Sequence, residues 1–473
     1  MLRLILITLT VCSLVGPVTG QKLWTLQDCI LYARQNSIAI KRAQNAISSA
    51  EVDKRRATHN RYPSLNANAS GGYQFGRTID PVSNSFNTTS IGFNGYSLNA
   101  GVTLFNGNRI NNQIQLAQLD LEAARLDADF MSDNLSLDIA TAYLNILLAE
   151  EQLQLVRKRL EQSQVQLDQT DKLIQAGSLP ENDRLNILSQ IATDEQTIID
   201  AQNQVEIAYL TLSQTMLLDP TEDFRIVKPN IEAPTDFDPD QVSLNETYVT
   251  AMSNQANIKA NQLRMQSAEK NVEVAKADFY PRLTIGGSIT TNYSNAARTF
   301  TPVETTSETT VSVNGEPFTF TFDDVDFIAG PYPYFDQLSD NLGQSLSAGV
   351  SIPLYNGFAA KLNTERARLG VINQELVSRE AEQTLLSNIQ QAIANAKAAK
   401  RSLDAAQIAV NASQAAFDNA KVQFDLGAIN SLDFSTARIN LDQSQISLIR
   451  AKYSYIFNIK QIEFYQGKGI SLN

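Results

Sequence analysis

The chain is poor in the residues from which catalytic and metal sites are built. Its 473 residues include one histidine, His59, two cysteines and one tryptophan. A structural zinc site takes four nitrogen or sulfur ligands, and a Ser-His-Asp triad needs a histidine beside the nucleophile. The sequence also contains no GxxxxGK[ST] motif and no GxGxxG motif for binding phosphates. We therefore predict no enzyme, no cofactor and no metal site.

Charged residues and long apolar runs are also scarce. Charged residues make up 19% of the chain, and the formal net charge is −12. Affinity for nucleic acid depends on Lys and Arg that neutralise phosphates, so this balance argues against a nucleic-acid partner. After residue 20 there is no run of 18 or more apolar residues, so no transmembrane helix is expected.

The first 20 residues have the pattern of a secretory signal peptide. Arg3 supplies a positive charge, residues 4–15 are mostly apolar, and small residues precede a cleavage site after Gly20. Removal of residues 1–20 leaves one cysteine, Cys29, so no intrachain disulfide can form. Cys29 lies on an apolar helical face and is expected to be a small buried side chain.

An internal duplication dominates the rest of the chain. Residues 25–65 match residues 243–283 without a gap, at an offset of 218. Residues 177–183 match residues 427–433 at an offset of 250, which is larger by 32. The second copy therefore carries one enlarged segment, which we predict to be a loop at 295–341. Two copies of this length indicate pseudo-symmetry and not a solenoid.

Each copy is predicted to run helix, strand, loop, strand, long helix, turn and long helix. Each first helix, of about 35 residues, begins with a capping box, at Thr25…Asp28 and Ser243…Glu246. The first repeat covers residues 21–217, with strands at about 64–77 and 91–105 and long helices at about 108–176 and 182–217. A Pro-rich linker at 218–242 leads to the second repeat at 243–466, with strands at about 282–293 and 343–355 and long helices at about 358–426 and 432–466. Residues 467–473 form a C-terminal tail, and the predicted fold class is α+β.

Alternation along the four strands predicts two unlike faces. Apolar residues alternate with small polar residues in each strand, as in transmembrane β-strands with lipid on one side and water on the other. The predicted lipid-facing residues are Tyr96, Leu98, Ala100, Val102, Leu104, Leu346, Val350 and Ile352. The same alternation also fits a soluble antiparallel sheet with one buried face, so the strands alone leave both interpretations open.

The long helices favour the membrane interpretation. Seventy residues separate Gly107 from Gly177, and the same number separates Gly357 from Gly427, with no proline inside either stretch. At about 1.5 Å per residue, each helix would be roughly 100 Å long. Apolar residues recur every seven positions, as at Leu116, Ala123, Phe130, Leu137 and Leu144, which indicates coiled-coil packing.

Three paired motifs occur in the same order in both repeats. The first helix of each repeat exits at Tyr-Pro, at 62–63 and 280–281, and each long helix is entered through Asn-Gly, at 106–107 and 356–357. Both long helices end in a Gly-x5-Asp turn, at 177–183 and 427–433. With these motifs in this order, the chain resembles the TolC-type outer-membrane factor family of Gram-negative bacteria. The resemblance covers essentially the whole chain after residue 20.

The resemblance implies a homotrimer whose sheets close a 12-stranded β-barrel in outer-membrane lipid, continued by a periplasmic α-helical barrel. The linker and chain ends would surround the middle of that helical barrel. The resemblance also implies a passive exit duct of a tripartite efflux or type I secretion system. Such a duct works with a periplasmic adaptor (a membrane fusion protein) and an inner-membrane pump.

By the same resemblance, the two Gly-x5-Asp turns would form the periplasmic tip. The implied tip and adaptor-docking residues are Gly177, Ser178, Leu179, Asp183, Gly427, Ala428, Ile429 and Asp433. In a trimer Asp183 and Asp433 would bring six carboxylates to a narrow pore mouth, or each would act at the start of its own helix. Asn182 and Ser431 are candidate helix caps. No Lys or Arg lies between Gly427 and Asp433, so apolar contacts are expected to hold the tip.

Oligomerisation also follows from the strand count alone. The smallest transmembrane barrels have about eight strands, so four strands need copies from other chains. The alternative function is a structural periplasmic coiled-coil adaptor or spacer. Such a protein would join one helical hairpin to soluble β-domains, without duplicated strands of this kind.

Overall fold

The computed structural model describes residues 23–79, 84–87, 90–219, 224–229, 232–234 and 237–469. The predicted signal peptide at 1–20, parts of the linker and the last residues of the tail lie outside this description. The chain divides into two units. The helical unit contains the residues up to 51, residues 119–266 and the residues from 371 onward, and the sheet unit contains residues 52–118 and 267–370.

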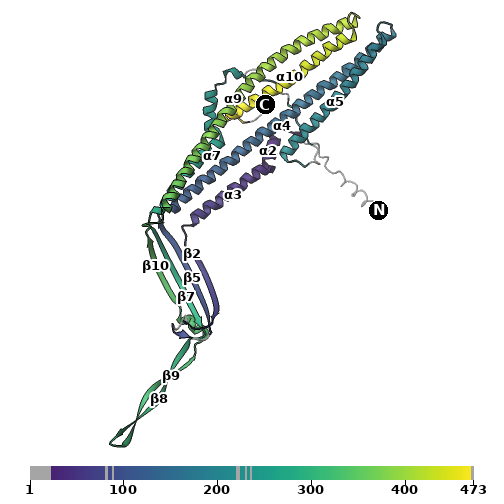
Figure 1. The fold of residues 1–473 in the computed structure, drawn as a ribbon. Coiled ribbons are helices and arrows are strands. Elements are labelled where there is room, and N and C mark those ends of the chain that lie inside the picture. The colour runs from purple at the N-terminus through teal and green to yellow at the C-terminus, as the bar shows by residue number, and fades with distance from the viewer. Residues whose placement is uncertain are drawn as a thin grey trace, which may run out of the picture. The chain divides into compact units, whose positions relative to one another are not determined.

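The sheet unit is built around four antiparallel strands, shown in Figure 1. The strands are β2 (Ser64–Gln74), β5 (Ile91–Asn106), β7 (Arg282–Ser294) and β10 (Gly343–Ser351), in the spatial order β10-β7-β5-β2. β2 pairs with β5 and β7 with β10, so each repeat supplies one pair, and β5 joins the two pairs through β7. β10 and β2 are therefore the edge strands of this sheet.

The register sorts apolar and polar side chains onto the two faces. Directly opposite residues share a face, and Leu98 lies opposite both Ala67 and Ile289. On the other face the hydroxyls of Ser288 and Ser345 are 2.8 Å apart. The sheet thus has one apolar face and one face of small polar side chains.

The segment predicted as a loop at 295–341 is regular structure, which corrects that prediction. β8 (Arg298–Val313) and β9 (Glu316–Pro331) form a hairpin of 16-residue strands, and α8 (Tyr334–Asp340) leads from it to β10. Asn314 and Gly315 at the turn have φ angles of 56° and 91°. Asn-Gly is the preferred pair for such a two-residue hairpin turn. The prediction of a loop did not take this pair into account.

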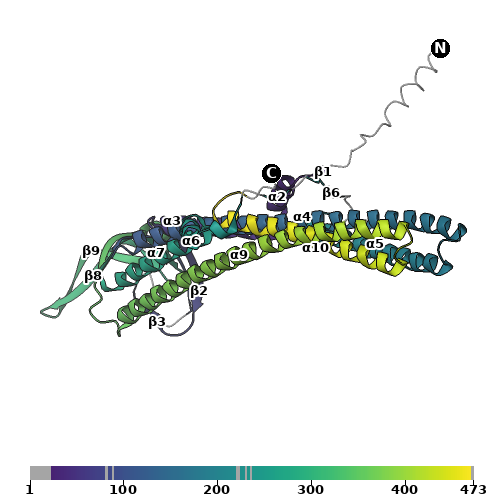
Figure 2. The same cartoon turned by 90° about the horizontal axis from the view of Figure 1, so that it is seen from above.

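Two long helical hairpins extend from the strands. α4 (Arg109–Gln175) and α9 (Ala359–Asp425) have 67 residues each, and they return as α5 (Glu181–Met216) and α10 (Ser431–Tyr465). All eight helix ends fall within one residue of the predicted positions. Figure 2 shows the turns of the two hairpins beside each other within the helical unit.

The first helix of each repeat is broken, where the sequence predicted one continuous helix. α2 (Leu26–Asn36) and α3 (Ile38–His59) meet at Ser37, and α6 (Leu244–Asn254) and α7 (Ala256–Lys276) meet at Gln255. Ser37 and Gln255 are equivalent positions, and their ψ angles of 128° and 123° are extended. One extended residue leaves no mark on the apolar periodicity, so the sequence did not reveal the break.

One buried core of the helical unit lies where α2 packs against the long helices. Trp24, Cys29, Tyr143 and Met216 belong to one buried cluster there. Cys29 has no exposed surface, which confirms the expectation of a small buried side chain. β1 (Leu23–Trp24) pairs in parallel with β6 (Arg225–Ile226), so the Pro-rich linker is tied to the start of the described chain.

Candidate functional site

The two turns at the ends of the helical hairpins, the tip turns, share one backbone geometry. Gly177 and Gly427 have left-handed φ angles of 76° and 71°. Each glycine N–H donates to the carbonyl three residues back, and the next N–H donates five residues back, all at 2.8–2.9 Å. This is the Schellman arrangement, in which a glycine closes a helix C-terminus. Ser178 and Ala428 are exposed, and Leu179 and Ile429 are half-buried.

The returning helices begin differently from the prediction. α5 starts at Glu181, so Asn182 lies inside the helix and does not cap it. α10 is capped by Asn430, whose side chain accepts a 2.8 Å hydrogen bond from the Asp433 N–H. Ser431, the other candidate cap, is instead the first residue of α10. Both candidate caps fail because each helix begins one residue earlier than the sequence predicted.

Asp183 and Asp433 are equivalent in the repeat but have different surroundings. Asp183 is 8% exposed and accepts a 2.5 Å hydrogen bond from the Ser431 hydroxyl. The Asn186 amide donates to the same hydroxyl at 3.1 Å. Asp433 is exposed. Ser431 therefore joins the two tip turns, and one carboxylate of this pair, not two, faces solvent in this conformation.

Different contacts close the two hairpins at their tips. In the first hairpin, Arg184 Nε lies 3.0 Å from the Asp171 carboxylate. The position equivalent to Arg184 in the second hairpin is Phe434, whose ring stacks on Phe424 with centroids 4.9 Å apart. Apolar contact was the prediction for the tip, and the second hairpin has it. The first hairpin carries an ion pair that the sequence analysis did not include.

Further along the same helices, four charged side chains form a buried cluster. α4 supplies Arg159, α5 supplies Asp194, and α10 supplies Arg438 and Asp442. Arg159 Nε lies 2.6 Å from Asp442 and 3.5 Å from Asp194, and Arg438 Nη2 lies 3.3 Å from Asp194. The side chain of Asp194 is 0% exposed and that of Arg438 is 8% exposed. The cluster pairs two arginines with two aspartates and joins three helices largely away from solvent, with the Arg159 side chain 13% exposed.

The two aspartates of this buried charge cluster differ in their hydrogen bonds and in the effect of burial on their charge. Asp194 accepts hydrogen bonds from the Ser163 hydroxyl and from the Gln190 amide, the latter at 2.8 Å. Burial raises the pKa of Asp442 to about 6, against the opposing effect of the two arginines. Asp194 therefore has the larger number of hydrogen bonds, and burial makes Asp442 easier to neutralise than an ordinary aspartate.

The buried charge cluster interrupts the internal repeat. The positions equivalent to Arg159, Asp194, Arg438 and Asp442 hold Ala409, Ser444, Leu188 and Ala192. Sequence analysis missed the cluster because its members come from three helices. The one local signal is the four-residue spacing of Arg438 and Asp442, which places both on one face of α10.

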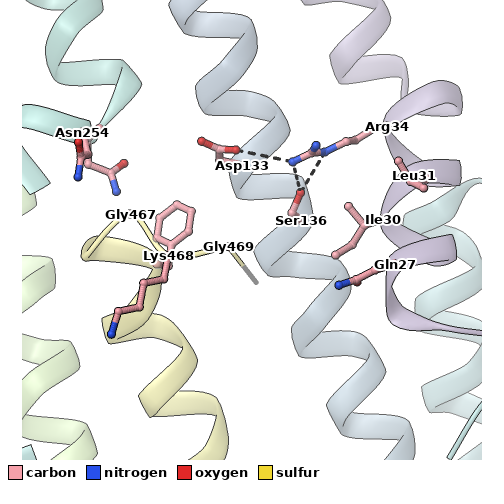
Figure 3. A pocket seen from close by; sticks show the side chains of 12 residues that line it. Gln27, Ile30, Leu31, Arg34, Asp133, Ser136, Asn254, Gly467, Lys468 and Gly469 are labelled. Atoms are coloured by element: carbon pink, nitrogen blue, oxygen red, sulfur yellow. Dashed lines mark hydrogen bonds and ion pairs between the residues drawn. The ribbon is translucent and has the colours of Figure 1, made fainter. Parts of the chain in front are cut away.

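The helical unit also contains a cavity of about 610 Å³, lined by α2, α4, the α6–α7 junction and the end of α10 (Figure 3). Arg34 donates to the Ser136 hydroxyl from Nε at 3.3 Å and from Nη2 at 3.0 Å, and it lies 3.7 Å from Asp133. Burial raises the pKa of Asp133, and the charge of Arg34 opposes that shift. None of the described lining residues is a histidine or a cysteine, so Ser136 has no imidazole or thiolate partner in this cavity.

The register of the sheet places six of the eight predicted lipid-facing residues on one face. These six are Tyr96, Leu98, Ala100, Val102, Leu346 and Val350. Leu104 lies in a β-bulge between Thr103 and Phe105, so the register gives it no directly opposite residue. Ile352 follows Ser351, the last residue of β10.

The short helix α8 covers one end of this apolar face. The hydroxyls of Tyr96 and Tyr334 are 2.9 Å apart, and the rings of Tyr334 and Tyr293 have centroids 4.6 Å apart. Tyr96, which the sequence predicted to face lipid, therefore also contacts α8. The prediction missed this contact because Tyr334 lies in the segment that was expected to be a loop.

Among the residues that the structure describes, no group of three His, Cys, Asp or Glu side chains could hold a metal ion. Within the same residues, no helix is long and apolar enough to cross a membrane.

A family profile described as outer membrane efflux protein matches residues 30–216 and 334–467 of this chain. The stretch between the two matched parts includes the linker and the β8–β9 hairpin. An uncharacterized protein of Haemophilus influenzae is 24% identical over 291 residues. That alignment covers 57% of this chain and 59% of the Haemophilus protein, so the chain spans little more than half of that relative.

Two solved structures share the fold. CusC, described as forming a transmembrane channel, aligns with a TM-score of 0.73 at 16% identity and 96% coverage of both chains. The outer membrane protein VceC of Vibrio cholerae aligns with a TM-score of 0.72 at 16% identity, over 94% of this chain and 97% of VceC. The predicted fold class, with long helices and a small sheet, is confirmed by these alignments.

Proposed function

Because the chain belongs to the outer membrane efflux protein family, we propose that it is a passive exit duct in the outer membrane of a Gram-negative bacterium. The observation that carries the proposal is the four-stranded sheet, with one apolar face, one polar face and two edge strands, joined directly to helices of 67 residues. Such a sheet can turn one face to lipid and the other to water once its edges are paired.

The functional unit is a homotrimer. Four strands are too few for closure, since the smallest closed transmembrane sheets have about eight. Three copies supply twelve strands, with β10 of one chain pairing with β2 of the next. The long helices of the three copies continue the closed sheet into the periplasm as a hollow helical wall.

The tip turns form the periplasmic entrance. Ser178 and Ala428 are exposed there and are the first contacts for a periplasmic adaptor, which links the duct to an inner-membrane pump. The bond between Ser431 and Asp183 and the buried charge cluster both hold α10 against the α4–α5 hairpin.

Mass measurement of the purified protein in mild detergent tests the assembly. We expect three copies, because closure of the sheet requires them. A stable monomer that still conducts ions would contradict the proposal. A protein that stays soluble without detergent would favour the periplasmic spacer instead.

Crosslinking in cells tests the orientation. Cysteines placed at Ser178 or Ala428 should crosslink to an adaptor, whereas matched cysteines at Ser85 or Thr309 in the sheet unit should not. The native Cys29 is buried and should give no background. Crosslinking from the sheet unit alone would invert the proposed orientation.

A further inference from the structure

The β8–β9 hairpin takes no part in the function proposed above. Figure 1 shows it projecting beyond the ends of β2, β5, β7 and β10. It lies in the segment that is enlarged in the second repeat, and outside the residues matched by the family profile. Among the described residues, β8 and β9 pair with each other and with no other strand.

One side of the hairpin near its turn is uncharged and largely apolar. We call this side the Phe face, and it consists of three phenylalanines on β9 and their three partners on β8. Phe318, Phe320 and Phe322 alternate along β9 and so share one side of the ribbon. They are 54%, 54% and 49% exposed. Their partners on β8 are Val311, Thr309 and Ser307. Contiguous exposed apolar side chains of this kind mark an interaction site, unlike apolar residues scattered singly over a surface.

The opposite side of the same stretch is polar. Thr319 and Thr321 alternate with the phenylalanines and lie opposite Thr310 and Glu308. The hydroxyls of Thr310 and Thr319 are 3.0 Å apart. An isolated two-stranded hairpin is at best marginally stable in water, so the apolar side of this stretch needs a partner.

All six residues of the Phe face are uncharged, and acidic residues lie at both ends of it. The next residues of β9 on this side are Glu316 toward the turn and Asp324 toward the root. Asp324 accepts hydrogen bonds from the Ser307 hydroxyl at 2.7 Å and from the Val325 N–H at 2.9 Å. These bonds lower the pKa of Asp324 and satisfy its charge within the hairpin. The Phe face therefore offers apolar contact, and the acid at its root end is bound within the hairpin.

The hairpin begins and ends beside an edge of the four-stranded sheet, which favours a second copy of this chain as the partner. β8 follows β7, and β9 returns through α8 to β10, which is an edge strand of the sheet. In the proposed trimer β10 pairs with the neighbouring copy. Each hairpin therefore emerges beside an interface between copies, and the three hairpins stand around one pore.

We propose that the three hairpins pack together through Phe318, Phe320 and Phe322 and form an apolar contact between copies at the outer mouth of the duct. This contact rests on the trimer of the proposed function. It covers the side chains that a single chain leaves half exposed, and it places a constriction on the exit side of the pore.

Cysteine crosslinking of the purified full-length protein tests the contact. Phe320→Cys should give crosslinked copies with a short bis-maleimide reagent. Val311→Cys keeps all three phenylalanines and should crosslink as well, because it shares the same side of the ribbon. The matched control is Thr321→Cys, which is adjacent to Phe320 but on the polar side. Its crosslinking should be severalfold weaker.

Mass measurement of the same samples separates this proposal from the proposed duct. A trimer without crosslinks at 320 and 311, or with equal crosslinking at 321, would overturn the hairpin contact and leave the duct intact. A monomer would overturn both. Crosslinks in intact cells to another protein, with none between copies, would show that a different partner covers the Phe face and would also overturn the proposal.

Discussion

Replacing Asp194 by asparagine is the most direct test of the buried charge cluster. Asp194 lies 3.3 Å from Arg438 and 3.5 Å from Arg159, and none of its side chain is exposed. Asparagine keeps the shape of the side chain but carries no charge, so two buried arginines are left with Asp442 alone. Removing one partner of a buried ion pair costs about 3–5 kcal/mol, whereas an exposed pair is worth about 0–1 kcal/mol. We therefore expect Asp194→Asn to lower the free energy of unfolding by about 3–5 kcal/mol.

Urea unfolding in mild detergent, followed by far-ultraviolet circular dichroism, measures this loss. Asp433→Asn is the matched control, because it makes the same chemical change at an exposed site and should cost about 0.5 kcal/mol or less. Adding Arg438→Met to Asp194→Asn should recover part of the loss, since it removes an uncompensated buried cation. A loss for Asp194→Asn no larger than that for Asp433→Asn would refute the reasoning.

Three further outcomes are expected. The pKa of Asp442 is raised from 3.8 to about 6, so the folded protein binds this proton more tightly than the unfolded chain does. The contribution of Asp442 to stability should therefore fall by roughly 3 kcal/mol in all, beginning near pH 4 and ending once the pH has risen past about 6, and Asp442→Asn should remove this slope in urea midpoints measured across that range. Leu98→Arg should cost about 2–4 kcal/mol if the site is near the bilayer midplane, whereas Asn99→Arg should be mild; equal heat stability of the two trimers would indicate a soluble sheet. Asp433→Asn should reduce cation selectivity in single-channel recordings, and unchanged selectivity would assign Asp433 to the helix end alone.

The positions of the long elements could be predicted from the sequence because their signals are local. α4 and α9 end just before Gly177 and Gly427, which have left-handed φ angles. A single glycine can adopt this conformation and end a helix, so each end is marked in the sequence by one residue. The four strands could be predicted because apolar and polar residues alternate every second position in the sequence. Successive side chains of a strand point to opposite faces with the same two-residue period. The turn at Asn314-Gly315 was equally local, so the β8–β9 hairpin could also have been predicted.

Contacts between segments that are distant in the sequence could not be predicted and were seen only in the tertiary structure. Asp183 and Asp433 occupy equivalent positions in the repeat, yet Asp183 is buried against Ser431 and Asp433 is exposed. The buried charge cluster draws its members from α4, α5 and α10, and α8 reaches back to cover Tyr96. Periodicity shows which side of a helix or strand is apolar, but it carries no information about which other element comes to lie against that side. That choice depends on packing across the whole chain, and for the Phe face and the sheet edges we expect it to depend on other copies as well.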